Sequence, residues 1–409
     1  MQSDPLWQKI LFLWMNPIYR VLHADKYNLI VLMLWTSSGI AVHLHHCGAG
    51  MLCGTFAIFI WLIKRYLICG PKFEVYRGVR RCDNSYLTPD RYRNAVLVLN
   101  EPNSYRNGYA YGEILADEIV HLVRRYMNIA RPKCSPEMMI QVRKNMPTKI
   151  WNELEGMRDA IDKKYPGKIS FDELIMLQMV PELTGLGCTV YGMRDNRRQI
   201  IFGRNMDWLP FSSAQYTVEI SYAREGYTSL CLPGMVGCVT GVRNNNNYVL
   251  AMNVTGGKYY KHFDRMPSMI YNRHLMQTCG TFTRAVQFMS DILPMSAYHL
   301  TITDYNTMHC YSYYQNAGET CIRTLGDNPG DKLVVLNCSY PEMSNGRFVS
   351  NYRNEACKQN PSSYQSREVI THVIDTLRRC QSVETVHSGI CDVSSFYFVA
   401  DNGYAADML

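Results

Sequence analysis

The sequence lacks C-x-x-C pairs, although it contains 15 cysteines in 409 residues. Structural zinc sites usually bring cysteines together in such pairs, and small disulfide scaffolds space them densely, so the sequence indicates neither. It also lacks helix-turn-helix, zinc-finger and aromatic-basic repeat patterns, which argues against nucleic-acid binding. A short cluster of His43, His45, His46 and Cys47 has no carboxylate beside it, and we interpret it as loop residues. We therefore expect no metal and no organic cofactor.

Charge is also scarce. Charged residues make up 19% of the chain, below the roughly 25% of ordinary soluble domains, and the net charge of +7 suits an anionic membrane surface. Residues 27–63 contain no Asp, Glu, Lys or Arg at all. Because one helix needs about 20 apolar residues to span a bilayer, this longer run predicts a hairpin of two helices, roughly 27–43 and 50–63.

Basic residues flank this run on both sides, which favours a cytosolic position for both flanks. A re-entrant or interfacial hairpin and a buried pair of soluble helices are the alternatives. We expect a membrane-anchor segment over residues 1–70 and a catalytic domain over residues 71–409.

The periodicity of the remaining chain is first helical and then strand-like. Residues 71–109 look irregular, whereas apolar residues recur at helical spacing over 110–127. Ser135 and Ser170 precede further helical stretches as candidate N-caps. From Cys188 onward, short β-branched and aromatic runs alternate with turns and are interrupted by two helical stretches. This pattern predicts an α+β fold with helices packed on stacked antiparallel sheets.

The most informative stretch runs from Gly187 to Asp207. Cys188 carries a thiol, and Arg204 and Asp207 follow it within one predicted β-hairpin. If the Gly187–Cys188 bond is cut, Cys188 gains an α-amine, whose pKa is about 8 in model peptides. A nucleophile that has an N-terminal amine as its base is an established catalytic arrangement. Residues three apart lie on opposite faces of a regular strand, so Arg204 and Asp207 both reach Cys188 only if the strand ends or bulges near residues 205–206.

Gly187-Cys188-Thr189, followed by Gly203-Arg204-Asn205-Met206-Asp207, resembles the pattern of N-terminal nucleophile cysteine hydrolases. The similarity is to the branch of acid ceramidase and N-acylethanolamine acid amidase, although Val190 stands where that branch has serine. The resemblance implies a four-layer αββα sandwich and self-cleavage between Gly187 and Cys188. It implies that Cys188 is nucleophile and base, that Arg204 steadies the thiolate and the substrate carbonyl, and that Asp207 orients the α-amine.

A weaker similarity extends over roughly residues 85–409. It implies that Asn337 occupies the position of an oxyanion-stabilising asparagine, with Asn253 as a second candidate. It also implies a late functional arginine at Arg353, with Arg347 as the rival. Thiolate attack on an amide carbonyl creates an oxyanion, and one side-chain amide N–H aimed at it contributes about 3 kcal/mol.

The sequence therefore predicts an amidohydrolase that cleaves an N-acyl lipid, of ceramide or N-acylethanolamine type, through an acyl thioester at Cys188. Its expected partners are that lipid and a membrane. An acyltransferase of the same fold, in which an amine intercepts the thioester, and an inactive membrane-tethered lipid-binding protein are the alternatives. The family resemblance implies a lysosomal or other lumenal localisation of the catalytic domain, whereas the basic residues that flank residues 27–63 favour the cytosolic face.

Overall fold

A computed structural model provides the structure of the protein. It describes residues 76, 78–89, 95–183, 187–208, 213, 216–243, 248–254, 262–314, 319–337, 348–381, 385–391, 395–400 and 405–409. The predicted anchor segment, residues 1–70, lies outside these residues, and so do the His43–Cys47 cluster and Arg347.

The predicted membrane-associated localisation, with a cytosolic or a lumenal catalytic domain, is corrected by the structure. Within the described residues, no helix is long and apolar enough to cross a membrane. The longest described helix, α4 (Ser104–Ala130), has 27 residues, but it carries exposed charged side chains such as Glu113, Asp117 and Arg124. The helical hairpin expected at residues 27–63 falls outside the described residues.

The part of the chain before Cys188 is mainly helical, as expected, but three strands precede the helices. Their segment, residues 71–109, looked irregular in the sequence; it contains β1 (Arg80–Cys82), β2 (Ser85–Pro89) and β3 (Ala95–Leu99). After α4 come α5 (Pro136–Lys144), α6 (Thr148–Lys164), α7 (Phe171–Leu177) and α8 (Val180–Leu183). Both predicted caps are confirmed, because Ser135 accepts a hydrogen bond from the Met138 N–H and Ser170 forms a capping box with Glu173.

The strands form two sheets. The larger has ten strands in the order β1-β2-β3-β6-β7-β8-β9-β10-β11-β12, and only the β3–β6 pair among its described ladders is parallel. Its remaining strands are β6 (Val218–Tyr222), β7 (Tyr227–Cys231), β8 (Thr240–Arg243), β9 (Val249–Val254), β10 (Tyr298–Thr303), β11 (Met308–Tyr314) and β12 (Glu319–Thr324).

The smaller sheet has five antiparallel strands in the order β13-β4-β5-β14-β15. These strands are β4 (Cys188–Arg194), β5 (Ile200–Asp207), β13 (Lys332–Val335), β14 (Thr385–Cys391) and β15 (Phe396–Ala400). Every residue of β4 and β5 is buried. The central hairpin of this sheet is therefore covered on both faces.

Strand alternation shows what covers each face. On β5, Phe202 packs in a core between the two sheets together with Ala251 and Met308 of the larger sheet. Its neighbour Ile201 points the other way, into a core with helix residues such as Val373. That helix, α12 (Ser366–Cys380), lies close because Gly203 has no side chain: a Cβ there would come within 2.5 Å of Val373 Cγ1.

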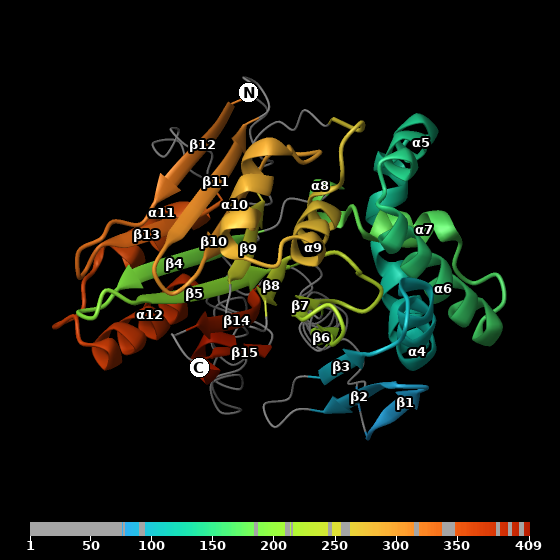
Figure 1. The fold of residues 1–409 in the computed structure, drawn as a ribbon, viewed down its shortest axis with the longest axis horizontal. Coiled ribbons are helices and arrows are strands. Elements are labelled where there is room, and N and C mark those ends of the chain that lie inside the picture. Colours follow the sequence, from blue (N-terminus) through green and yellow to red (C-terminus); the bar gives the residue numbers. More distant parts are fainter. Residues whose placement is uncertain are drawn as a thin grey trace, which may run out of the picture.

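The outer face of the larger sheet packs against the helices that precede Cys188 and against α9 (Ser268–Thr278) and α10 (Phe282–Asp291). Helix α11 (Phe348–Lys358) packs beside α12 on the smaller sheet. Figure 1 shows α4 to α7 as one group, with α12 next to β4 and β5. The expected α+β fold with two sheets is confirmed, and the order helix, sheet, sheet, helix is consistent with the predicted four-layer sandwich.

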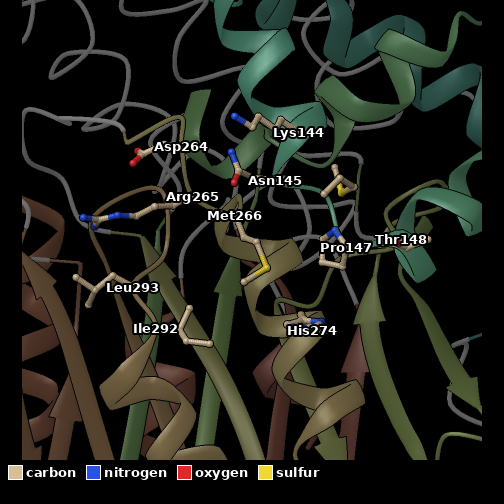
Figure 2. Close-up of a pocket in the computed structure, with 11 residues that line it drawn as sticks. Lys144, Asn145, Pro147, Thr148, Asp264, Arg265, Met266, His274, Ile292 and Leu293 are labelled. Atoms are coloured by element: carbon tan, nitrogen blue, oxygen red, sulfur yellow. The ribbon is translucent and has the colours of Figure 1, made fainter.

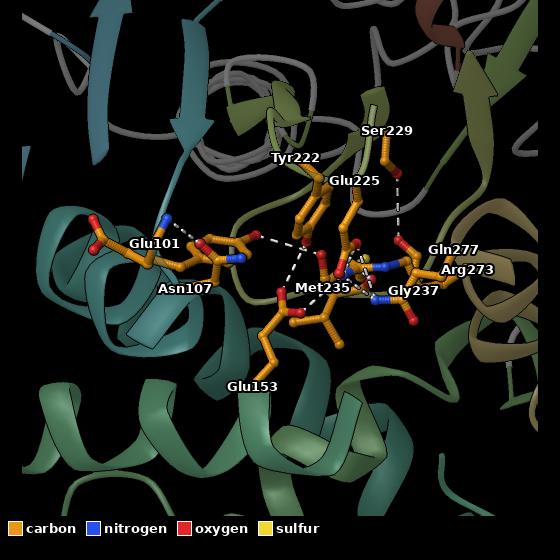
Figure 3. A network of polar contacts seen from close by, with 12 residues as sticks. Glu101, Asn107, Glu153, Tyr222, Glu225, Ser229, Met235, Gly237, Arg273 and Gln277 are labelled. Carbon is orange, nitrogen blue, oxygen red and sulfur yellow. Dashed lines mark hydrogen bonds and ion pairs between the residues drawn. The ribbon is translucent and has the colours of Figure 1, made fainter. Parts of the chain in front are cut away.

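A buried ion pair ties the first helices to the strands that follow Cys188. Arg273 of α9 lies 2.9 Å from Glu153 of α6, and both side chains are almost fully buried. The guanidinium also lies over the Tyr222 ring, 3.6 Å from its centroid, and the Tyr222 hydroxyl donates to Glu153 over 2.9 Å. Figure 3 shows Glu153 below Tyr222, with dashed lines from its carboxylate to the groups above it. Buried charges are stable only when they are paired in this way.

We predict that Glu153→Gln lowers the free energy of unfolding by about 3 kcal/mol, because the buried Arg273 loses its closest counter-charge. Chemical denaturation measures the change. Glu155→Gln, on the same helix but partly exposed, is the matched control and should change stability by less than about 0.5 kcal/mol. Equal stabilities for the two variants would contradict the assignment.

Candidate active site

The site is centred on the first residue of β4. Cys188 is 2% exposed and pairs directly with Met206 of β5, while Val190 pairs with Arg204. Because Val190 points into the core between the sheets, strand alternation places Cys188, two residues before it, on the same face. The Arg204 guanidinium reaches along this face and donates to Cys188 Sγ at 3.6 Å.

Arg204 is held on this face by the larger sheet. Its guanidinium donates to the Met252 carbonyl over 2.8 Å and to Asn253 Oδ1 over 3.2 Å. Burial lowers the pKa of Arg204, while the nearby Cys188 and Asp207 raise it. The structure thus brings the predicted residues Cys188, Arg204 and Asn253 together between the two sheets.

Asp207 approaches from the other face. Its carboxylate pairs with the buried Arg353 of α11 and accepts a hydrogen bond from Thr385 Oγ1 over 2.7 Å. The strand end or bulge expected near residues 205–206 is absent, because β5 runs through Asp207 in unbroken register with β4. The irregularity in pairing lies on β14, between Thr385 and His387. Arg204 and Asp207 therefore flank Cys188 from opposite faces of one strand.

The Gly187–Cys188 bond lies against Asp207. The Asp207 N–H donates to the Gly187 carbonyl over 2.9 Å, and a Cβ on Gly187 would lie 2.5 Å from Asp207 Oδ2. Position 187 consequently requires glycine. This contact gives a structural reason for the glycine directly before the cysteine.

Asn337, directly beyond β13, contacts Cys188 itself. Its Oδ1 accepts from the Cys188 N–H over 2.5 Å, and its Nδ2 donates to the Val254 carbonyl over 2.7 Å. The amide of Asn253 donates instead to the Val335 carbonyl over 2.9 Å. In this uncut chain both amide N–H groups are therefore engaged by carbonyls, and an oxyanion role for either asparagine stays a prediction.

Of the two late arginines, Arg353 is the one placed by the structure. It is 1% exposed and is paired with Asp207, whereas its rival Arg347 lies outside the described residues.

Burial raises the pKa of the Cys188 thiol, and the Arg204 guanidinium opposes this shift. The thiol therefore needs a base before it can attack, because the thiolate is the reactive form.

Sequence reasoning missed His387. On the smaller sheet Met206 pairs with Cys188 on one side and with His387 on the other, so the three side chains share one face. His387 is 2% exposed and lies 3.4 Å from Thr240 Oγ1. Burial and the Arg204 charge hold the pKa of His387 well below its usual value. Nothing in the strand sequence Thr385–Cys391 distinguished this histidine from a core residue.

Two cavities in the described part of the chain are candidate binding sites. One, of about 10 Å³, is lined by residues of the Cys188 face, including Met206, Trp208 and His387, and has room for about one water. The other, of about 510 Å³, lies between the α5–α6 junction and residues 264–266, with His274, Ile292 and Leu293. Figure 2 shows apolar side chains below and Lys144, Asp264 and Arg265 around it. None of the predicted catalytic residues lines the larger cavity.

Within the described residues, no group of three or more His, Cys, Asp or Glu side chains is placed to hold a metal ion.

Comparison with known protein families gives a match over about half of the chain. Residues 193–394 match the family model described as acyl-coenzyme A:6-aminopenicillanic acid acyl-transferase. The resemblance to N-terminal nucleophile enzymes is thereby confirmed. The match indicates an enzyme, hydrolase or acyltransferase, and it includes Arg204, Asp207 and Arg353. It begins after Cys188, so the assignment of the nucleophile depends on the geometry above.

Among solved structures, the chain is similar to a Caenorhabditis elegans N-acylethanolamine-hydrolyzing acid amidase ortholog. The identity is 18% and the TM-score 0.44, over 52% of this chain and 100% of the other. A similarity of this degree assigns no activity. No curated protein sequence matches the chain.

We predict that His387 makes stability sensitive to acid. Since its pKa is lowered in the folded state, its contribution is present above the unfolded pKa of about 6.5 and is lost as the pH falls toward the folded value. Below pH 6.5 the free energy of unfolding should therefore decrease as the pH is lowered. His387 should contribute up to about 1.4 kcal/mol of this decrease per pH unit.

Denaturation of wild-type and His387→Gln protein at a series of pH values gives the free energy of unfolding as a function of pH. The contribution of His387 is the difference between the two slopes. His262→Gln, which changes a histidine with a 42% exposed side chain, should have the same slope as the wild type. A slope that is unchanged in His387→Gln would show that His387 is not the acid-sensitive group.

Proposed function

We propose that the protein is an N-terminal nucleophile amidase that cleaves the amide bond of an N-acyl lipid of ceramide or N-acylethanolamine type. One observation carries the proposal: the Gly187–Cys188 bond lies against Asp207, while the Cys188 thiol receives a hydrogen bond from Arg204. A thiol, a latent α-amine, a buried cation and a buried carboxylate thus meet at one bond. This set matches the requirements of a nucleophile that uses its own amine as base.

Activation begins with the uncut chain. Cys188 Sγ attacks the Gly187 carbonyl carbon, the C–N bond to Cys188 breaks, and the nitrogen takes up a proton. Water then hydrolyses the Gly187 thioester, which leaves a carboxylate on Gly187 and a thiol and an α-amine on Cys188. Because the Asp207 carboxylate lies against Gly187, it is placed to hold the new ammonium group.

Catalysis then repeats the attack on a substrate amide. The α-amine accepts the thiol proton, Sγ attacks the acyl carbonyl, and the same proton passes to the leaving amine. Arg204 stabilises the thiolate, and Asn337, whose side chain contacts the Cys188 N–H, donates to the oxyanion. Water finally releases the fatty acid from the acyl thioester. Arg353 supplies the buried counter-charge to Asp207.

An acyltransferase is the second candidate, and the family match favours it because its description names acyl transfer. In that reaction an amine, in place of water, attacks the acyl thioester at Cys188. Product analysis with and without added amines separates the two. A new N-acyl amide at the expense of free acid would identify a transferase, and free acid alone would identify a hydrolase.

We predict that the chain cuts itself between Gly187 and Cys188, giving pieces of 187 and 222 residues (409 − 187). Intact-mass measurement of protein from its own cells tests this directly. Cys188→Ala removes the nucleophile and should remain one chain, whereas Cys279→Ala should be cut like the wild type. Amide hydrolysis by a wild-type chain that stays uncut would refute the N-terminal amine mechanism.

We also predict that Asp207→Asn lowers amidase turnover about 100-fold or more, because the α-amine loses the charge that orients it and the acid–base step fails. Steady-state release of fatty acid from an N-acylethanolamine or a ceramide in detergent is the measurement. Asp162→Asn changes an exposed acid and should keep normal turnover. Near-normal turnover of Asp207→Asn would remove Asp207 from the mechanism. Absence of both turnover and self-cleavage in the wild type would favour an inactive lipid-binding protein.

A further inference from the structure

Two cysteines behind the site lie close enough to be joined. Cys357 on α11 and Cys380, the last residue of α12, have sulfur atoms 3.7 Å apart. Both are buried, with exposures of 2% and 0%. The sulfurs of a disulfide are about 2.05 Å apart, so small side-chain rotations that bring them about 1.7 Å closer would form the bond.

The surroundings favour such a bond. Cys357 and Cys380 belong to the apolar core that includes Tyr191, Val373 and Leu377, where a disulfide replaces two weakly polar thiols by one apolar group. The hydrogen bond from the Cys357 thiol lowers the pKa of Cys380, and the positive charges of Arg353 and Arg379 act in the same direction. Cys380 is accordingly the thiol of the pair that ionises first, as the attacking group of a thiol–disulfide exchange must.

We propose that Cys357 and Cys380 are a modification site that forms a disulfide between α11 and α12. Both thiols are buried, so the exchange takes place when α11 opens locally from α12. With glutathione disulfide as oxidant, the Cys380 thiolate then attacks one sulfur of that molecule and releases one glutathione thiolate. Cys357, as it loses its proton, then attacks Cys380 Sγ and expels the second glutathione. The two cysteines are oxidised by two electrons in total, and one glutathione disulfide is reduced to two glutathione molecules.

The link would fix the helix that carries Arg353. Arg353 and Cys357 lie one turn apart on α11, so they share a face of that helix, and the Cys380 thiol also donates to the Arg353 carbonyl at 3.7 Å. Helix α12 is seated on β5 through Val373 and Leu377 over Gly203. A bond from α12 to α11 therefore ties Arg353 to the strand that ends in its ion-pair partner Asp207.

The test maps the bond in the full-length chain. Wild-type protein is incubated with excess glutathione disulfide, unfolded, alkylated and digested without reduction. We expect one linked peptide pair containing Cys357 and Cys380, lighter by two hydrogen atoms than the two thiol peptides together and separated by dithiothreitol. Cys357→Ala should lose this pair, and Cys279→Ala, which changes a buried cysteine elsewhere, should keep it. Separate alkylation of Cys357 and Cys380 after this treatment would overturn the proposal.

A second measurement tests the effect on the fold. Oxidation should raise the melting temperature of the wild type by on the order of 5 °C and leave that of the Cys357→Ala, Cys380→Ala double variant unchanged. An equal rise in both proteins would assign the effect to another thiol and overturn the proposed clamp. Neither measurement needs amidase turnover, so the result stands apart from the outcome for the proposed function.

Discussion

The antiparallel register between β4 and β5 is the constraint on which the site depends. It sets Cys188 opposite Met206 and Val190 opposite Arg204, which places the thiol and the guanidinium on one face, within 3.6 Å of each other. A slip of one residue would move every side chain of β4 to the opposite face. Both faces of this hairpin are buried in different cores, so such a slip would put every side chain of β4 into the wrong core and would separate Cys188 from Arg204.

The same alternation separates the two charged groups of the site. Arg204 points between the sheets and finds the Met252 carbonyl and Asn253 there. Asp207, three residues later, points toward the helices and finds Arg353. Burial without partners would cost several kcal/mol for each charge, so each requires a second element to be in place. The chemistry at Cys188 thus depends on packing from the larger sheet on one side and from α11 on the other.

The segments before and after Cys188 are also held together by side-chain contacts. Glu153 and Tyr111 precede the cysteine, and their partners Arg273 and Gly234 follow it. These contacts are buried and polar, and they bring the first helices against the larger sheet. A cut of the backbone between Gly187 and Cys188 would leave them intact, because none of them passes through that bond. Cys188 therefore lies where a cut would not separate the layers around it.

The sequence by itself determined those structural elements that depend on residues close together along the chain. The helical spacing of 110–127, the caps at Ser135 and Ser170, and the spacing of Cys188, Arg204 and Asp207 all follow from neighbours along the chain, and the structure has each of them in a matching element. It also determined the nature of the fold, since helices followed by short strands require stacked layers. Strand β3 escaped prediction because its partner β6 lies more than a hundred residues away. Strands β1 and β2 pair locally, but they have only three and five residues.

Only the tertiary structure decided which distant groups meet Cys188. Asn337 was placed on resemblance, but its contact with the Cys188 nitrogen depends on β13 pairing with β4. The ion pair of Arg353 with Asp207 depends on the packing of α11 at the end of β5. His387 and the Cys357–Cys380 pair gave no signal in the sequence, because a buried histidine or cysteine has the same local pattern whatever lies across from it. Their roles arise from long-range contacts, which local spacing does not encode.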